Sequence, residues 1–236
     1  MTIETVKLST GASMPILGLG TLLRYKYIVG PAFLNDMQIP LEIDHMDTWR
    51  AMEKLYDDGK LKAIGLSNFN AKQVQYVYDN ARIKPANLQV ECHLYWPQTE
   101  LLQLCRKLNM TLTANSPLGS RGREGYNLNV KGPQGDPLTD PLVNELSVKY
   151  KKTEAQILLR FLIQQGIVVI PKSIHPDRVK ENMAVFDFSL NPDDMNRLFS
   201  VKTRVRLLRW DFAIGHPFYP FDDVDQSKLR MTSIKP

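Results

Sequence analysis

Cysteine is scarce in this chain. The 236 residues include two cysteines, Cys92 and Cys105, and neither stands at a zinc-ligand spacing from another possible ligand. Free thiols in a reducing compartment are the simple interpretation, and we expect no metal site. His93 and His175 are also isolated in the sequence, so we interpret each as a surface or packing residue rather than a metal ligand.

Long apolar runs are absent as well. No run is long enough to cross a bilayer, and residues 1–7 lack the apolar stretch of a signal peptide, which predicts a cytoplasmic protein without a membrane segment. The net charge is +5, and basic residues are mostly interleaved with acidic ones, which does not favour nucleic-acid binding. With 43% hydrophobic residues, the length suits one large domain with its own core.

Short apolar segments alternate with helical patterns along the chain. After a hairpin that turns at residues 10–11, strands are expected at 16–20, 61–66, 87–92, 111–115 and 167–171. Helices are expected at 47–56, 72–78, 98–108, 142–150, 153–164, 176–185 and 192–198. Asp47 is a possible cap of the first helix, and Thr153 with Gln156 has the capping-box pattern. The alternation of strands and helices indicates parallel βα units.

The predicted strands end in side chains that can form hydrogen bonds. These residues are Ser67, Asn68, Gln89, Glu91, Asn115, Ser116, Lys172 and Ser173. Polar groups at the carboxyl ends of successive parallel strands mark the active face of a (β/α)8 barrel or of a doubly wound sheet. The alternative is that strand ends are polar because they meet water.

One stretch combines a strand end with the start of a helix. Lys172 and Ser173 follow an apolar run, and the helix that begins at Pro176 brings Arg178 into its first turn. An ammonium, a hydroxyl and a guanidinium near a helix N-terminus suit a phosphate monoester. A solvated loop with scattered charges is the alternative.

Several motifs resemble those of a known family. Residues 52–69, which end in Gly-Leu-Ser-Asn-Phe, and residues 170–182, which begin Ile-Pro-Lys-Ser, match nearly whole. Shorter matches are Gly-Leu-Gly-Thr at 18–21, Glu-Cys-His at 91–93, Ser-Pro-Leu-Gly at 116–119 and Tyr-Pro-Phe at 219–221. In these residues the chain resembles the aldo-keto reductase superfamily, over residues 1–21 and about 46–222.

The resemblance implies a monomeric (β/α)8 TIM-barrel oxidoreductase that reduces small-molecule aldehydes or ketones to alcohols with NADPH. By position, Ser67, Asn68 and Gln89 would hold the carboxamide of the nicotinamide. The pyrophosphate path would be lined by Ser116, Leu118 and Ser120, and the 2′-phosphate would be held by Lys172, Ser173 and Arg178. Glu181 and Asn182 would contact the adenine end, and Thr21 and Asn115 complete the cofactor-binding set.

The chain departs from the family pattern after Thr21. The family's catalytic Asp, Tyr, Lys and His lie in a segment that is missing here, so no catalytic residue is assigned. The second to fourth strands of the barrel are expected to be missing with it. Residues 22–46 replace the segment and contain Tyr25, Lys26, Tyr27, Asp44 and His45. These side chains share one irregular stretch, whereas a general acid needs rigid support, so we do not expect them to replace the catalytic set.

Two further substitutions affect the expected binding sites. Asn115 stands where the family usually has an aromatic ring that stacks on the nicotinamide. Stacking on an aromatic ring contributes about 1–3 kcal/mol for a nucleic-acid base, so its loss predicts cofactor binding that is weaker by about ten- to a hundredfold. Leu22 stands where the family often has Trp, which removes a wall of the substrate pocket.

The sequence therefore predicts one domain over residues 1–236, an incomplete barrel of an internally shortened family member, with residues 202–236 as a C-terminal substrate-loop tail. The basic run at 202–210 has a second interpretation, as a surface for an anionic membrane or a partner groove. Three functions stay open: a carbonyl reductase with doubtful turnover, an inactive NADPH-binding relative, and a fragment that associates through open barrel edges with a full-length reductase.

Overall fold

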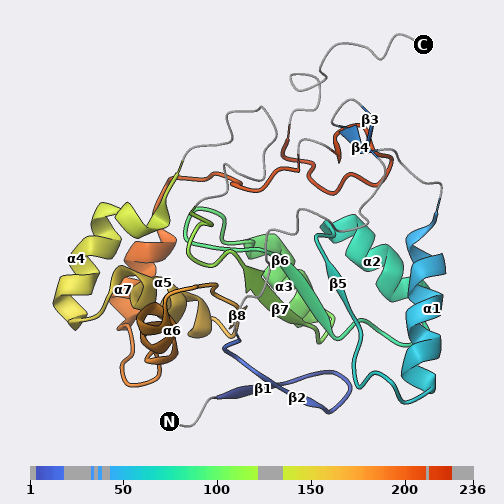
Figure 1. Cartoon of the computed structure of the whole chain (residues 1–236), viewed down its shortest axis with the longest axis horizontal. Coiled ribbons are helices and arrows are strands. Elements are labelled where there is room, and N and C mark those ends of the chain that lie inside the picture. The colour runs from blue at the N-terminus through green and yellow to red at the C-terminus, as the bar shows by residue number, and fades with distance from the viewer. Residues whose placement is uncertain are drawn as a thin grey trace.

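A four-stranded parallel sheet lies at the centre of the molecule (Figure 1). The computed structural model describes residues 4–18, 33–34, 37–38, 43–121, 135–210 and 213–224. The strands lie in the order β5 (Gly65–Ser67), β6 (Asn87–Glu91), β7 (Thr111–Asn115) and β8 (Val168–Val169). Residues 16–18 continue the sheet beyond β8, because the Val169 N–H donates to the Ile16 carbonyl and the Gly18 N–H to the Val169 carbonyl, both at 2.9 Å.

Helices lie on either side of this sheet in Figure 1, with α1 and α2 on one side and α4 to α7 on the other. Their bounds are α1 (His45–Asp57), α2 (Ala71–Asn80), α3 (Thr99–Lys107), η2 (Pro137–Thr139), α4 (Pro141–Tyr150), α5 (Glu154–Ile163), α6 (Pro176–Met183) and α7 (Pro192–Phe199). Two antiparallel pairs complete the described elements: β1 (Thr5–Lys7) with β2 (Ser13–Pro15), and β3 (Phe33–Leu34) with β4 (Met37–Gln38). The predicted hairpin is confirmed, with Gly11 at φ +81° in its turn.

The predicted helices are confirmed within a few residues at each end, but the cap of α1 was placed wrongly. Asp44 is the N-cap, and its carboxylate accepts from the Met46 N–H at 2.6 Å. Asp47 lies inside the first turn, where it pairs with Arg50. The strand predicted at 61–66 was also misplaced, because β5 begins only at Gly65, where it meets Asn87 of β6.

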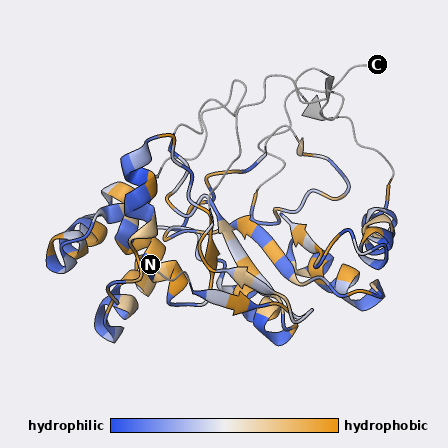
Figure 2. Ribbon diagram, turned by 60° about the horizontal axis from the view of Figure 1, so that its bottom comes forward, coloured by the Kyte–Doolittle hydropathy of each residue, from blue (hydrophilic) through white to orange (hydrophobic). Residues whose placement is uncertain are grey.

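The core lies between the strands and helices, whose apolar residues are orange in Figure 2. Leu88 and Leu112 are cross-strand neighbours with almost no exposed surface. Helix α5 is buried on nearly every side, with seven of its residues in the interior. Trp49 of α1 is 1% exposed and donates its indole N–H to the Ile83 carbonyl. This hydrogen bond joins α1 to the chain between α2 and β6.

A buried carboxylate joins α4 to α7. Asp194 is 1% exposed and accepts from Lys149 Nζ at 2.7 Å and from the Tyr150 hydroxyl at 2.5 Å. Burial alone would raise the pKa of Asp194, but these hydrogen bonds outweigh it and hold the pKa below its usual range. The two helices are therefore held by a satisfied charge rather than by apolar contact alone.

The start of α5 gives a test of local stability. The capping box is confirmed: the Gln156 N–H donates to Thr153 Oγ1 at 3.3 Å, and the Thr153 N–H donates to Gln156 Oε1 at 2.9 Å. Thr153→Ala should lower the free energy of unfolding by about 1 kcal/mol, because one helix N–H loses its acceptor. Urea denaturation measures this, with Thr203→Ala on the exposed chain as control; equal midpoints for the two variants would contradict it.

Candidate functional site

Polar side chains of three neighbouring strands lie on one face of the sheet. In the parallel register, Ser67 lies opposite Gln89, and Gln89 lies opposite Thr113. Because side chains alternate along a strand, the same face also carries Asn87, Glu91, Thr111 and Asn115. The buried Leu88 and Val90 point to the other face. The register thus gathers hydrogen-bonding groups from β5, β6 and β7 on a single surface.

The residues predicted to hold the nicotinamide carboxamide are brought together. The Asn68 N–H donates to the Gln89 carbonyl at 2.9 Å, and Asn68 Nδ2 donates to Ser67 Oγ at 3.3 Å. Ser67 is exposed and Gln89 is half-buried, so both side chains retain solvent-facing surface. The side-chain amides of Asn68 and Gln89 and the hydroxyl of Ser67 can therefore form hydrogen bonds with a planar group such as a carboxamide.

The loop after β7 holds the residues predicted for the pyrophosphate path. Ser116 and Ser120 have φ of +51° and +53°, in the left-handed region that residues other than glycine rarely adopt. Between them Gly119 has φ +84°, and a Cβ at that position would lie 2.4 Å from the Pro137 ring. Leu118 is half-buried against the core. The chain therefore turns tightly in the loop of residues 116–120, directly after Asn115.

The predicted phosphate-binding residues lie at the start of α6 and just before it. Lys172 and Arg178 are exposed, and within the described residues neither side chain has a hydrogen bond or an ion pair. Ser173 is half-buried, and its Oγ accepts from the His175 N–H at 3.1 Å. Glu181 is exposed, whereas Asn182 is 6% exposed. Two cations without a described protein partner therefore stand beside a helix N-terminus, as an anion site requires.

Glu91 has a role that the sequence did not indicate. It is 3% exposed, and its Oε1 accepts from the Leu207 N–H at 2.7 Å, while its Oε2 accepts from the Leu208 N–H at 3.0 Å. His93 Nε2 lies 2.9 Å from the same Oε1. The sequence placed Glu91 at a strand end beside His93, but nothing in it indicated a partner 116 positions away.

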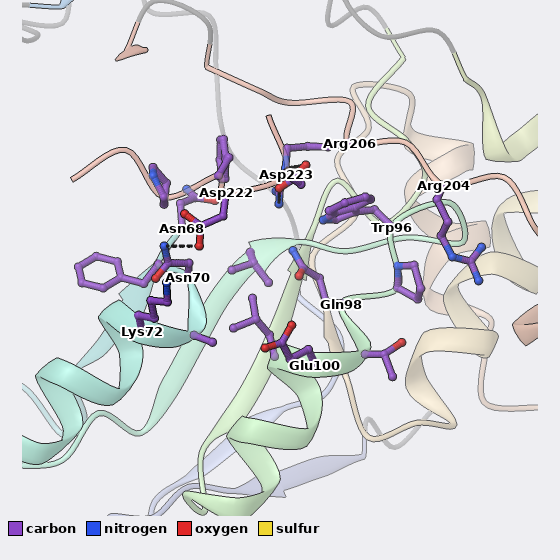
Figure 3. Close-up of a pocket in the computed structure, with 18 residues that line it drawn as sticks. Asn68, Asn70, Lys72, Trp96, Gln98, Glu100, Arg204, Arg206, Asp222 and Asp223 are labelled. Atoms are coloured by element: carbon purple, nitrogen blue, oxygen red, sulfur yellow. Dashed lines mark hydrogen bonds and ion pairs between the residues drawn. The ribbon is translucent and has the colours of Figure 1, made fainter. Parts of the chain in front are cut away.

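A cavity of about 420 Å³ lies beside the carboxyl ends of β5 and β6 (Figure 3). The first turns of α2 and α3 form one side of it, and the C-terminal segment forms the other. The Arg206 guanidinium lies 4.6 Å from the Trp96 ring and 4.0 Å from the Phe221 ring, and it pairs with Asp223 at 2.7 Å. Asn68 is the one predicted cofactor residue in the described lining, so the cavity adjoins the predicted cofactor path.

The predicted cofactor residue Thr21 lies outside the described residues, as do Leu22, Tyr25, Lys26 and Tyr27 of the replacement stretch. Asp44 and His45 are described. Asp44 caps α1 and accepts from the Tyr76 hydroxyl at 3.2 Å. The His45 ring lies between Phe69 and Phe218, with centroids 4.5 and 4.4 Å away. Both side chains thus have structural contacts at the start of α1.

Comparison with known proteins assigns the family. Residues 34–202 match the model of the Aldo/keto reductase family. The chain belongs to this family. It is 45% identical over 191 residues to aldo-keto reductase family 1 member A1 of Gallus gallus, covering 76% of this chain and 57% of that protein. It is 44% identical over 181 residues to aldo-keto reductase family 1 member D1 of Mus musculus, covering 75% and 54%.

Solved structures agree with this assignment. Aldose reductase from Schistosoma japonicum aligns with a TM-score of 0.73 at 37% identity, covering 88% of this chain and 64% of that chain. An aldo-keto reductase complexed with NADPH aligns with a TM-score of 0.81 at 24% identity, covering 99% and 97%, a likeness that concerns the fold. The family predicted from the motifs is confirmed, and its members are (β/α)8 barrels that use NADPH. The chain spans little more than half the length of the curated relatives it matches.

The described residues contain neither a membrane-spanning helix nor a cluster of metal ligands. No helix there is both long and apolar enough to span a bilayer. The His, Cys, Asp and Glu side chains in the described ranges form no group of three that could hold a metal ion.

The position of His45 predicts a pH dependence of stability. Burial lowers the pKa of His45 below 6.5, Asp44 opposes this effect, and His216 adds to it. The folded state therefore favours neutral His45, and its contribution is complete above pH 6.5 and is lost as the pH falls and the unfolded chain takes up the proton. His45→Phe should reduce the loss of stability between about pH 7 and about pH 5. Urea midpoints measure this, with the exposed His175→Phe as control; parallel curves for all three proteins would refute the assignment.

Proposed function

We propose that this chain binds NADPH at the carboxyl ends of β5 to β8 and the first turn of α6, and that its own reduction of aldehydes or ketones is impaired. The observation that carries the proposal is the register that sets Ser67, Gln89 and Asn115 on one face of the sheet. The carboxamide, pyrophosphate and phosphate groups of a dinucleotide would each meet residues of matching chemistry along this edge. Cys92 and Cys105 are free and buried, which favours a reducing, cytoplasmic location.

The phosphate end favours NADPH over NADH. Lys172 and Arg178 supply two positive charges, and the backbone at the start of α6 adds N–H donors beside Ser173. NADH has a neutral hydroxyl at the adenosine 2′ position, which would form no ion pair with Lys172 or Arg178. The 2′-phosphate of NADPH would accept hydrogen bonds from both. Asp177 in the first turn is the one acidic side chain there, and it reduces the attraction without cancelling two cations.

The impaired turnover follows from the residues between Thr21 and α1. This stretch does not contain the family's catalytic motif, and the two candidate replacements that are described, Asp44 and His45, have structural contacts. We therefore assign no catalytic residue. We also propose that residues 1–236 form a single barrel-derived domain without the second to fourth family strands. Residues 22–46 would stand in their place, and residues 202–236 would form the substrate-loop tail.

Arg178 provides a test of cofactor binding. Arg178→Ala should weaken NADPH binding by about tenfold or more, because a charge-assisted hydrogen bond to phosphate contributes roughly 1.5–3 kcal/mol. NADH binding should change little, because NADH lacks the 2′-phosphate. Fluorescence titration of the purified chain measures both, with Lys180→Ala on the same helix as the matched control. No saturable NADPH binding by the unchanged chain would refute the proposal.

The same preparation separates the active from the inactive alternative. Loss of NADPH absorbance that depends on an added aldehyde and disappears in Lys172→Ala would identify a working reductase. Saturable binding without such turnover would identify an NADPH-binding relative that has lost the reaction. Either outcome keeps the cofactor site and decides only what the bound cofactor does.

A free strand edge favours association as a second function. Among the described strands β5 pairs only with β6, and Gly65 and Ser67 are exposed. An unpaired edge presents backbone N–H and C=O groups to another chain. A second copy or a full-length reductase of the family is the expected partner.

Light scattering tests this association. The mass should rise above 27.0 kDa with concentration, or on addition of a full-length aldo-keto reductase. The edge can also be followed by hydrogen exchange at β5, which should slow in the complex while exchange on the exposed face of α4 stays unchanged. If this chain kept a mass of 27.0 kDa both in the concentration series and after addition of the full-length reductase, association at these concentrations would be excluded.

A further inference from the structure

The buried carboxylate of Glu91 meets three polar groups, one from a residue close by in the chain and two from the C-terminal segment. Two are the consecutive backbone N–H groups of Leu207 and Leu208, at 2.7 and 3.0 Å. The third is the ring of His93, whose Nε2 lies 2.9 Å from Oε1. His93 Nδ1 has no hydrogen-bond partner among the described residues. Both oxygens of the Glu91 carboxylate thus have a polar partner.

The bound segment carries Arg206, which lines the cavity described above. Leu207 follows Arg206 directly, and the Val205 N–H donates to the Tyr95 carbonyl at 3.0 Å. Residues 205–208 are thus fixed on both sides of Arg206. With its backbone held there, the Arg206 guanidinium reaches the position between Trp96 and Phe221 and the ion pair with Asp223.

The same strand also carries the proposed nicotinamide contacts. Glu91 lies two residues after Gln89 on the same face of β6, and its cross-strand neighbour is Asn115. The contact between Glu91 and the C-terminal segment is therefore adjacent to the end of the cofactor site where a substrate would meet the nicotinamide.

We propose that Glu91 is a positioning residue that holds residues 205–208 against the carboxyl end of β6 and so sets the cavity wall of Arg206 and Asp223. The role of this wall in substrate contact rests on the proposed function. The positioning itself does not, because it is a property of the chain without cofactor. Removing the charge should release the segment while leaving the sheet intact.

Hydrogen exchange of the cofactor-free protein tests the positioning. The Leu207 and Leu208 N–H groups donate to different oxygens of Glu91, and in Glu91→Gln one of these becomes an NH2 group that cannot accept. Exchange at Leu207 and Leu208 should therefore accelerate roughly ten- to a hundredfold. Glu53→Gln is the matched control, because Glu53 is 7% exposed and its carboxylate accepts from the Arg82 and Ile83 N–H groups at 2.8 Å. Both N–H groups donate to Glu53 Oε1, which the glutamine amide oxygen can replace, so the control should leave exchange at Leu207 and Leu208 unchanged.

The Trp96 indole gives a second, spectroscopic signal. Release of the segment withdraws Arg206 from the ring, so the Trp96 indole N–H resonance should shift in Glu91→Gln and stay in place in Glu53→Gln. Glu91→Asp keeps the charge on a shorter side chain, and it should give exchange rates between those of the wild type and Glu91→Gln.

Two outcomes would overturn the proposal. Equal exchange at Leu207 and Leu208 in Glu91→Gln and Glu53→Gln would mean that packing alone holds the segment. Loss of protection at Leu88 and Leu112 in Glu91→Gln would mean that Glu91 supports the whole sheet. A failure of the unchanged chain to bind NADPH refutes the cofactor site separately, because the exchange experiment contains no cofactor.

Discussion

The parallel pairing of β6 with β7 is the constraint on which the rest of the structure depends. Five residue pairs fix it, from Asn87 with Thr111 to Glu91 with Asn115. One further hydrogen bond, from the Cys92 N–H to the Asn115 carbonyl at 3.2 Å, carries the alignment past the end of the strands. A slip of one residue would turn the polar face toward the helices and bring Leu88 and Val90 into its place.

The end of β6 and the residues just after it also contact segments that are remote in sequence. Glu91 binds the C-terminal segment, and the Tyr95 hydroxyl donates to Asp140 at 2.9 Å. Asp140 in turn caps α4 by accepting from the Leu142 N–H at 2.9 Å. Burial and the neighbouring Asp140 raise the pKa of Tyr95, so its phenol stays protonated and serves as a fixed donor. One strand end thus positions both the cavity wall and the first turn of α4.

Patterns carried by neighbouring residues were predictable from the sequence. The capping box of α5, the hairpin turn and the order of strands and helices depend on local chemistry and period, and the structure confirms them. The family followed from motif strings that span consecutive residues. The Glu91 contact was not predictable, since the atoms that meet it belong to backbone groups, which any sequence supplies. The cap of α1 was missed for a related reason, because Asp44 and Asp47 are both plausible caps and only the path of the preceding chain decides between them.

The left-handed backbone at Asn68, Ser116 and Ser120 limits how this edge of the sheet can change in evolution. Each such position costs about 1–3 kcal/mol for an ordinary side chain, less for Asn and essentially nothing for Gly. Exchange of either serine for glycine would therefore be tolerated by the fold, whereas a β-branched residue would be penalised before it touched any ligand. Residue identity along this edge is filtered first by backbone geometry, so a retained Asn or Ser there is not by itself a sign of a retained function.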